Sequence, residues 1–126
     1  MALVNLAKRE SEKHKPTRYF SSRQERAVAK AIEGQQTLNS GATRWQKSDV
    51  LTEQFAIECK TKTTASESIS LKKEWFDKQR QEALFMGKPY SAIVFSFGPD
   101  QENHYIIDEY LFQFLQEKLK ELDQPL

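Results

Sequence analysis

The sequence predicts an α/β domain, because segments with the apolar period of a helix alternate along the chain with segments patterned like strands. Its 126 residues are the size of one domain. A composition of 38% hydrophobic and 29% charged residues, with four Gly and four Pro, is that of a compact globular protein. The expected order is helix, two strands, helix, strand, strand, helix, and it predicts a central β-sheet flanked by helices.

The N-terminal segment is polar and shows no sustained period, so we expect a flexible basic arm at 1–20 ahead of one folded domain at 21–126. A helix is expected to begin at Ser22, and Ser22 and Glu25 have the spacing of a capping box. Apolar residues recur at helical spacing after this point: Val28, Ala29 and Ile32. Gly34 supplies a stop for this helix.

The next part of the chain predicts a β-hairpin. Residues 35–47 form a loop in this interpretation, and a short strand at 49–51 is joined by a tight connection to a clearer strand at 54–61. In the second strand, apolar and polar residues alternate with a period of two. Glu58 and Lys60 are therefore expected on the same face of that strand.

The second half of the chain predicts a helix, two strands and a C-terminal helix. The first of these helices runs from Leu71 to Met86 with Ser70 as its cap. The nearly continuous apolar run at 90–97 is typical of a central strand covered on both faces. A strand at 104–107 follows, and Asp108 caps the last helix. We expect that helix to pack on the core, while two of its aromatic side chains widen its apolar side enough to suggest a homodimer contact: Phe112 and Phe114.

Charge is distributed unevenly although the net charge is only +1. Residues 1–30 hold eight Lys or Arg against three Glu, whereas residues 100–126 hold seven acidic residues against two Lys. This asymmetry predicts one face that meets a polyanion such as DNA and another that is turned away from it. A single cysteine, Cys59, and apolar stretches too short to span a bilayer lead us to expect a reduced cytoplasmic protein without membrane contact.

Four polar residues occupy positions where apolar residues would be easier to explain. Glu25 leans toward the buried face of the first helix, Asp49 begins the hairpin, and Glu58 and Lys60 lie within an apolar strand. Three carboxylates and an amine are thus expected to gather at one edge of the sheet. Hard oxygen ligands suit Mg²⁺, for which Mn²⁺ can substitute, and a metal beside a lysine suits hydrolysis of a phosphodiester.

The same residues resemble the PD-(D/E)xK nuclease superfamily, and most closely its archaeal and phage members that act like Holliday junction resolvases. The resemblance covers roughly residues 20–97 and rests on Glu25, on Ser40-Gly41-Ala42, on Lys47-Ser48-Asp49-Val50 and on Ile57-Glu58-Cys59-Lys60-Thr61. Ser48 stands where the family name has proline. The resemblance implies a restriction-endonuclease-like core with a mixed central sheet, a Mg²⁺-dependent endonuclease activity on branched DNA, and a homodimer.

The resemblance also implies roles for individual residues. Asp49, Glu58 and the backbone carbonyl of Cys59 would ligate the metal, Lys60 would position or activate the attacking water, and Glu25 would complete the acidic cluster. Residues expected to contact DNA follow from the resemblance or from their basic and aromatic character: Ser40, Arg44, Trp45, Lys47, Lys62, Arg18 and Arg23. Gln79 lies on the apolar side of its helix, where it would support the site from behind or contact DNA.

Alternative interpretations remain at this level. Glu25 would also serve as a capping-box residue, and Glu58 and Lys60 would also form a simple ion pair on a strand. A restriction-like or recombination and repair nuclease that acts on duplex or single-stranded DNA fits the same motif. So does a non-catalytic DNA-binding protein, although Asp49, Glu58 and Lys60 are all present.

Overall fold

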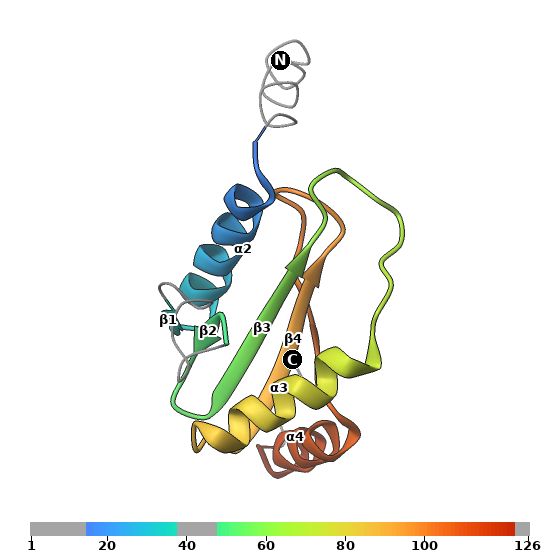
Figure 1. Cartoon of the computed structure of the whole chain (residues 1–126). Coiled ribbons are helices and arrows are strands. Elements are labelled where there is room, and N and C mark those ends of the chain that lie inside the picture. The colour runs from blue at the N-terminus through green and yellow to red at the C-terminus, as the bar shows by residue number, and fades with distance from the viewer. Residues whose placement is uncertain (1–14, 38–47, 123–126) are drawn as a thin grey trace.

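The computed structural model describes residues 15–37 and 48–122. Its elements are α2 (Thr17–Ala31), β1 (Gln35–Gln36), β2 (Val50–Leu51), β3 (Phe55–Thr61), α3 (Lys73–Phe85), β4 (Tyr90–Ser96), β5 (His104–Ile106) and α4 (Glu109–Leu122). The five strands form one mixed sheet in the order β1-β2-β3-β4-β5. Only β3 and β4 are parallel, with α3 as the crossover between them, and the other neighbours are antiparallel. The described chain is therefore a single α/β domain with helices around a mixed sheet (Figure 1).

The hairpin predicted from the sequence is confirmed by the pairing of β2 with β3. Val50 lies opposite Ile57, and the Asp49 N–H donates to the carbonyl of Ile57 at 2.9 Å. Thr52 closes the turn, where its side-chain oxygen accepts from the N–H of Phe55 at 2.9 Å. The pairing ends at Val50, and the side chain of Asp49, the residue before it, lies beside Glu58 and Cys59 of β3.

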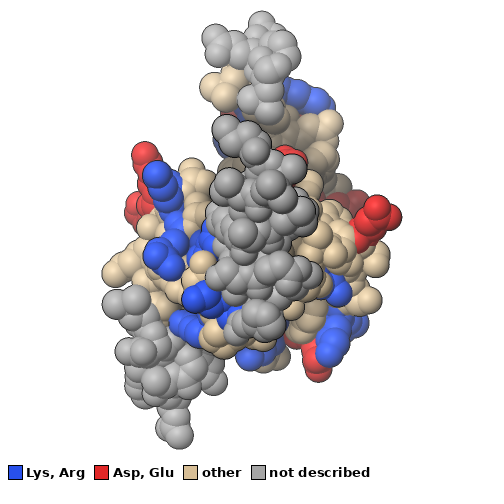
Figure 2. Space-filling model, turned by 90° about the horizontal axis from the view of Figure 1, so that it is seen from above, with Lys and Arg blue, Asp and Glu red and all other residues tan. Residues whose placement is uncertain are grey.

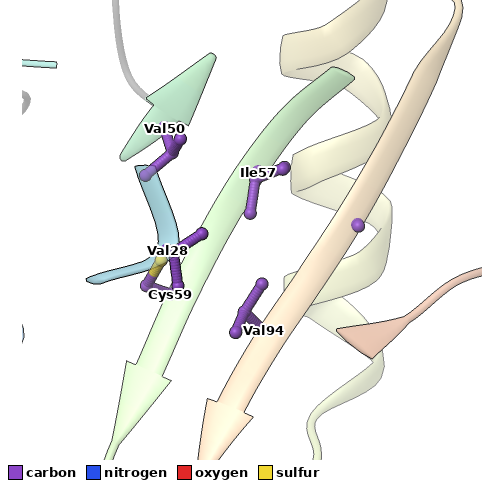
Figure 3. Packing of buried hydrophobic residues seen from close by; sticks show 6 residues of the cluster. Val28, Val50, Ile57, Cys59 and Val94 are labelled. Carbon is purple, nitrogen blue, oxygen red and sulfur yellow. The ribbon is translucent and has the colours of Figure 1, made fainter. Parts of the chain in front are cut away.

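The two faces of β3 meet different helices. Ile57 and Cys59 point toward α2 and form the main core cluster with Val28, Val50 and Val94 (Figure 3). The intervening side chains point to the other face, where α3 crosses the sheet. The predicted period of two is thus correct, and Glu58 and Lys60 share a face. β4 is an interior strand between β3 and β5, as its continuous apolar run predicted.

Helix α2 begins earlier than the sequence predicted. Its first residue is Thr17 with Pro16 at the N-cap, and Phe20 is buried at 4% exposure. The boundary of the expected arm at residue 20 is therefore wrong, because residues 17–20 belong to the helix. Ser22 lies inside α2, so the predicted capping box does not exist and cannot account for Glu25. Pro favours the start of a helix, since it lacks the N–H that would be unpaired there.

Three further predictions need correction. The segment expected as a loop contains β1, which pairs with β2. Helix α3 starts at Lys73 after Lys72, so Ser70 is not its cap. Helix α4 packs on the core much less than expected, because Leu111 is its one buried residue. The expected cap of α4 is confirmed, since Asp108 Oδ1 accepts from the N–H of Leu111 at 2.9 Å. Among the described residues, none of the helices has the length and apolar character needed to cross a bilayer.

Candidate active site

The acidic cluster predicted from the sequence is assembled by three elements. Glu25 comes from α2, Asp49 from the residue before β2, and Glu58 from the middle of β3. Glu25 is 2% exposed and Asp49 is 8% exposed. Glu58 is more exposed, with 25% of its side chain accessible to solvent. Asp49, at the edge where β2 ends, thus lies near both Glu25 from α2 and Glu58 from β3.

Asp49 lies at the centre of this cluster. Its Oδ2 atom accepts a hydrogen bond from the backbone N–H of Cys59 at 2.9 Å. This bond holds the carboxylate against β3 at the point where β2 has ended. Asp49 also lies close enough to hydrogen-bond the carboxyl groups of Glu25 and Glu58. One buried carboxylate therefore links the other two.

Burial and mutual repulsion change how the two glutamates titrate. Burial, followed by the negative charge of Asp49, raises the pKa of Glu25 to about 7. The same two causes in the same order raise the pKa of Glu58 to about 8, and Lys60 opposes this change. Such groups need either protons or a nearby cation, because carboxylates that share a site cannot all ionise freely. A positive charge near the cluster would therefore stabilise its ionised carboxylates.

Lys60 is the nearest lysine to the acidic cluster among the described contacts. Its Nζ atom lies 3.8 Å from Glu58 Oε1 and 4.4 Å from the centroid of the Trp75 ring. The ring comes from α3 and holds the ammonium group over the face that Glu58 also occupies. The simple ion pair considered from the sequence is thus present, but it is part of the larger cluster. Arg18 approaches the cluster from α2, with Nη1 3.6 Å from Glu25 Oε1.

The backbone carbonyl of Cys59 points to the same edge as Asp49. Within a strand, the N–H and C=O of one residue point to the same side. The N–H of Cys59 is bonded to Asp49, so its carbonyl faces the space beyond the end of β2. Burial raises the pKa of the Cys59 thiol, whose side chain lies in the core on the α2 side. Only the backbone of Cys59 is therefore placed to serve as a ligand.

The donor set fits a hard divalent cation. In the part of the chain that the structure describes, no group of three or more His, Cys, Asp or Glu side chains is placed so that it could hold a metal ion. Mg²⁺ does not require such a set, because it keeps several waters and takes one or two carboxylates from the protein. Asp49 lies beside Glu58, and the Cys59 carbonyl shares their edge. These three groups could hold one ion.

A second polar network begins at Ser48, the residue before Asp49. It includes Glu82, which was not singled out from the sequence. Ser48 is fully buried. Its hydroxyl accepts from Gln79 Nε2 at 2.8 Å and donates to Glu82 Oε2 at 3.1 Å. Gln79 was expected to need a partner, and Ser48 is that partner. Glu82 could have been identified from its spacing, because it lies one helical turn after Gln79 on the same side of α3.

Two side-chain amides form hydrogen bonds between α2 and the strands around the site. Gln24 Nε2 donates to the backbone carbonyl of Lys60 at 2.8 Å. Gln36 Nε2 on β1 donates to Glu25 Oε2 at 3.1 Å. Neither bond was predicted from the sequence. For Gln36 the reason is that β1, the strand that carries it, was expected to be a loop. These bonds fix α2 relative to the strand that carries Glu58 and Lys60.

The structure describes only some of the residues that were expected to contact DNA. Ser40, Arg44, Trp45 and Lys47 lie outside the described residues. Arg18 is exposed on α2, with 59% of its side chain accessible. Arg23 is less accessible, because it bonds the hydroxyl of Tyr19 at 3.0 Å and forms an ion pair with Asp100. Lys62 directly follows β3 and is partly exposed.

Comparisons of this chain with protein-family models, with curated proteins and with solved structures found no significant match. The functional interpretation therefore depends on the geometry of the site.

Proposed function

We propose that this protein is a Mg²⁺-dependent endonuclease that hydrolyses phosphodiester bonds of branched or structured DNA. The observation that carries the proposal is the placement of Asp49 beside Glu58, with Lys60 on the same face as Glu58 and the Cys59 carbonyl at the shared edge. This is the constellation that the resemblance to PD-(D/E)xK nucleases implies. The restriction-endonuclease-like identity of the core is part of the same proposal.

Asp49, Glu58 and the Cys59 carbonyl would hold the ion in this mechanism. When bound, Mg²⁺ neutralises phosphate charge and lowers the pKa of an attacking water. Lys60 places a positive charge beside Glu58, where it stabilises charge that develops on the phosphate or orients the water. Asp49 is preorganised for its role, because the Cys59 N–H and the Ser48 network behind it limit its movement.

The exposed side of α2 suits a DNA backbone. Three exposed basic residues lie on this helix, Arg18, Arg26 and Lys30, and Lys15 lies just before it. Lys and Arg side chains are frequent contacts of DNA phosphates. Figure 2 shows Lys and Arg side chains at several places on the face seen from above. The same helix thus carries Glu25 inward and positive charge outward.

The test compares cleavage by the wild-type protein and by Glu58→Gln on a labelled four-way junction, a linear duplex and a single strand, with Mg²⁺ or with EDTA. The expected result is cleavage of the junction that needs both Mg²⁺ and Glu58. Glu53→Gln is the matched control, because Glu53 is exposed on the hairpin turn and the chemical change is identical. Loss of a catalytic group of this type lowers the rate by about 10²-fold or more.

The other outcomes distinguish the alternatives. Cleavage of linear or single-stranded DNA in preference to the junction would reassign the protein to the restriction-like or repair nucleases. DNA binding without metal-dependent cleavage of any substrate would support the non-catalytic interpretation. Equal cleavage by wild type and Glu58→Gln would remove the acidic cluster from the mechanism.

A further inference from the structure

A polar cleft lies between α2 and the chain that follows β4. Its volume is about 580 Å³, within the range of roughly 300–1,000 Å³ that small-molecule sites occupy. Residues 19–27 of α2 form one wall, residues 96–103 form the other, and Thr61 at the end of β3 lies between them. Figure 1 shows the first turns of α2 beside the loop after β4, at the upper end of the molecule. The three carboxylates of the acidic cluster do not line this cleft, so it is a separate site.

A buried amide with an unused acceptor lines the cleft. Gln24 is 8% exposed, and its Nε2 atom donates to the backbone carbonyl of Lys60 at 2.8 Å and to Asn103 Oδ1 at 3.2 Å. Because the Lys60 carbonyl can only accept, this bond determines which end of the amide carries the nitrogen. Gln24 Oε1 is then buried without a hydrogen-bond partner among the described residues. An unpaired buried oxygen costs free energy, which a ligand with an N–H group would recover.

The rim of the cleft carries positive charge and flat side chains. Its charged lining residues are Arg23, Arg26 and Asp100, so two positive charges stand against one negative charge. Arg23 pairs with Asp100, and its guanidinium group lies 5.5 Å from the centroid of the Tyr19 ring. Arg26 is exposed. Nucleobases stack on aromatic rings and guanidinium planes, and arginine binds phosphate, so these side chains suit the two parts of a nucleotide.

We propose that this cleft binds one unpaired nucleotide, with an N–H group of the base donating to Gln24 Oε1 and the phosphate contacting Arg26 at the rim. A simple anion such as inorganic phosphate has no base to reach the buried amide. A cationic donor such as a guanidinium ligand is repelled by the excess of arginine. A base joined to a phosphate supplies both the donor and the negative charge.

The fold itself fixes the wall that follows β4. Ser96 Oγ donates to the carbonyl of Gly98 at 3.1 Å, and the N–H of Ser66 donates to the carbonyl of Phe97 at 2.7 Å. A Cβ atom at Gly98 would lie 2.8 Å from the Cα atom of Ala65, so only glycine allows this close approach. The segment after β3 therefore holds the loop in place, and binding has little chain to order.

Two sources supply such a nucleotide, the free molecule and an unpaired position in a DNA strand. Gln24 precedes Glu25 on α2 and bonds the carbonyl of Lys60, so the cleft lies next to the acidic cluster. A nucleotide of a branched DNA held here would anchor the strand beside the site of cleavage. This link to DNA rests on the proposed nuclease function, whereas the affinity of the cleft for a nucleotide does not.

Titration of the wild-type protein in EDTA, followed by nuclear magnetic resonance, tests the proposal. The ligands are deoxynucleoside monophosphates, deoxyribose phosphate and inorganic phosphate. The nucleotides should shift the side-chain amide signals of Gln24 and Asn103 and bind at least about tenfold more tightly than deoxyribose phosphate, which has no base. A short single strand and an abasic strand of equal length test the DNA source in the same way. Base-dependent binding of the strand alone assigns the source to DNA, and base-dependent binding of the monophosphates alone assigns it to the free nucleotide.

Ala27→Phe fills the cleft from its exposed α2 wall and should weaken nucleotide binding at least about tenfold. Ala31→Phe is the matched control, because it makes the same change one helical turn later at an exposed position that does not line the cleft. Circular dichroism verifies that both variants are folded. Binding that is independent of the base in every ligand, or unchanged by Ala27→Phe, would overturn the proposal. These measurements contain no Mg²⁺ and no cleavage step, so their outcome is separate from that of the nuclease test.

Discussion

The acidic cluster predicts that the metal-free protein loses stability as the pH rises from 5 to 8. The pKa values of Glu25 and Glu58 are raised to about 7 and about 8 in the folded chain, from an ordinary value of 4.5. In this window, the folded state holds more protons than the unfolded state. The free energy of unfolding therefore falls with increasing pH. The stabilising effect of protonation is complete below the unfolded pKa and is lost as the pH passes the folded pKa.

The size of the effect follows from the displacement of each pKa. One pKa unit corresponds to about 1.4 kcal/mol, so ionising Glu25 in the fold costs about 3 kcal/mol and ionising Glu58 about 5 kcal/mol. The two values are not additive, because both groups interact with Asp49. Part of Glu58 is also exposed, and solvent reduces its share. We therefore expect a total loss of about 3 kcal/mol between pH 5 and pH 8, a sizeable part of the stability of a small domain.

Urea unfolding monitored by tryptophan fluorescence measures this loss in EDTA and in Mg²⁺. Glu58→Gln should reduce the pH dependence, because a neutral amide needs no proton, and the part that remains belongs to Glu25. Mg²⁺ should restore stability at pH 8 more than at pH 5, since a cation replaces the protons. Glu53→Gln is the control and should retain the wild-type slope. An unfolding free energy that stays constant or increases from pH 5 to pH 8 in EDTA would refute this account of the cluster.

Three further predictions concern the neighbours of the cluster. Lys60→Met should lower the single-turnover cleavage rate by about 10²-fold or more, and a rate within about twofold of wild type would exclude a catalytic role for the ammonium group. Ser48→Ala should lower the free energy of unfolding by about 1–3 kcal/mol, because it leaves the Gln79 amide and the Glu82 carboxylate without their shared partner, and an unchanged urea midpoint would contradict this. Arg26→Gln/Lys30→Gln should weaken DNA binding and reduce the slope of log affinity against log salt by about 2, whereas Lys118→Gln/Lys120→Gln, with the same loss of charge on α4, should not.

Much of the site was accessible from the sequence, because its signals are local. The alternation along β3 predicts that Glu58 and Lys60 share a face, and the pairing of β2 with β3 confirms the expected hairpin. Glu25 was expected on the inner side of its helix and is 2% exposed there. Each of these predictions uses only the period of one element or the length of one turn. Periods of this kind follow from backbone geometry, which is the same in every protein.

Other features depend on distant parts of the chain. β1 has two residues and no apolar pattern, so only its pairing with β2 defines it as a strand. The start of α2 at Thr17 depends on a core that covers Phe20. Ser48, Gln79 and Glu82 come together only when α3 crosses the sheet. No local period contains this information, because it arises from contacts between residues that are far apart along the chain.

The sequence by itself determined the class of the fold, the hairpin and the identity of the four polar residues, since hydrophobic period and residue chemistry are properties of short segments. The tertiary structure decided how these residues act on one another. It placed Asp49 between two glutamates, buried Glu25 and Asp49, left Glu58 only partly exposed, and thereby raised the pKa values of Glu25 and Glu58. It also left several large apolar side chains of α4 exposed. Burial and electrostatic coupling depend on distances in space, and only the packed chain sets those distances.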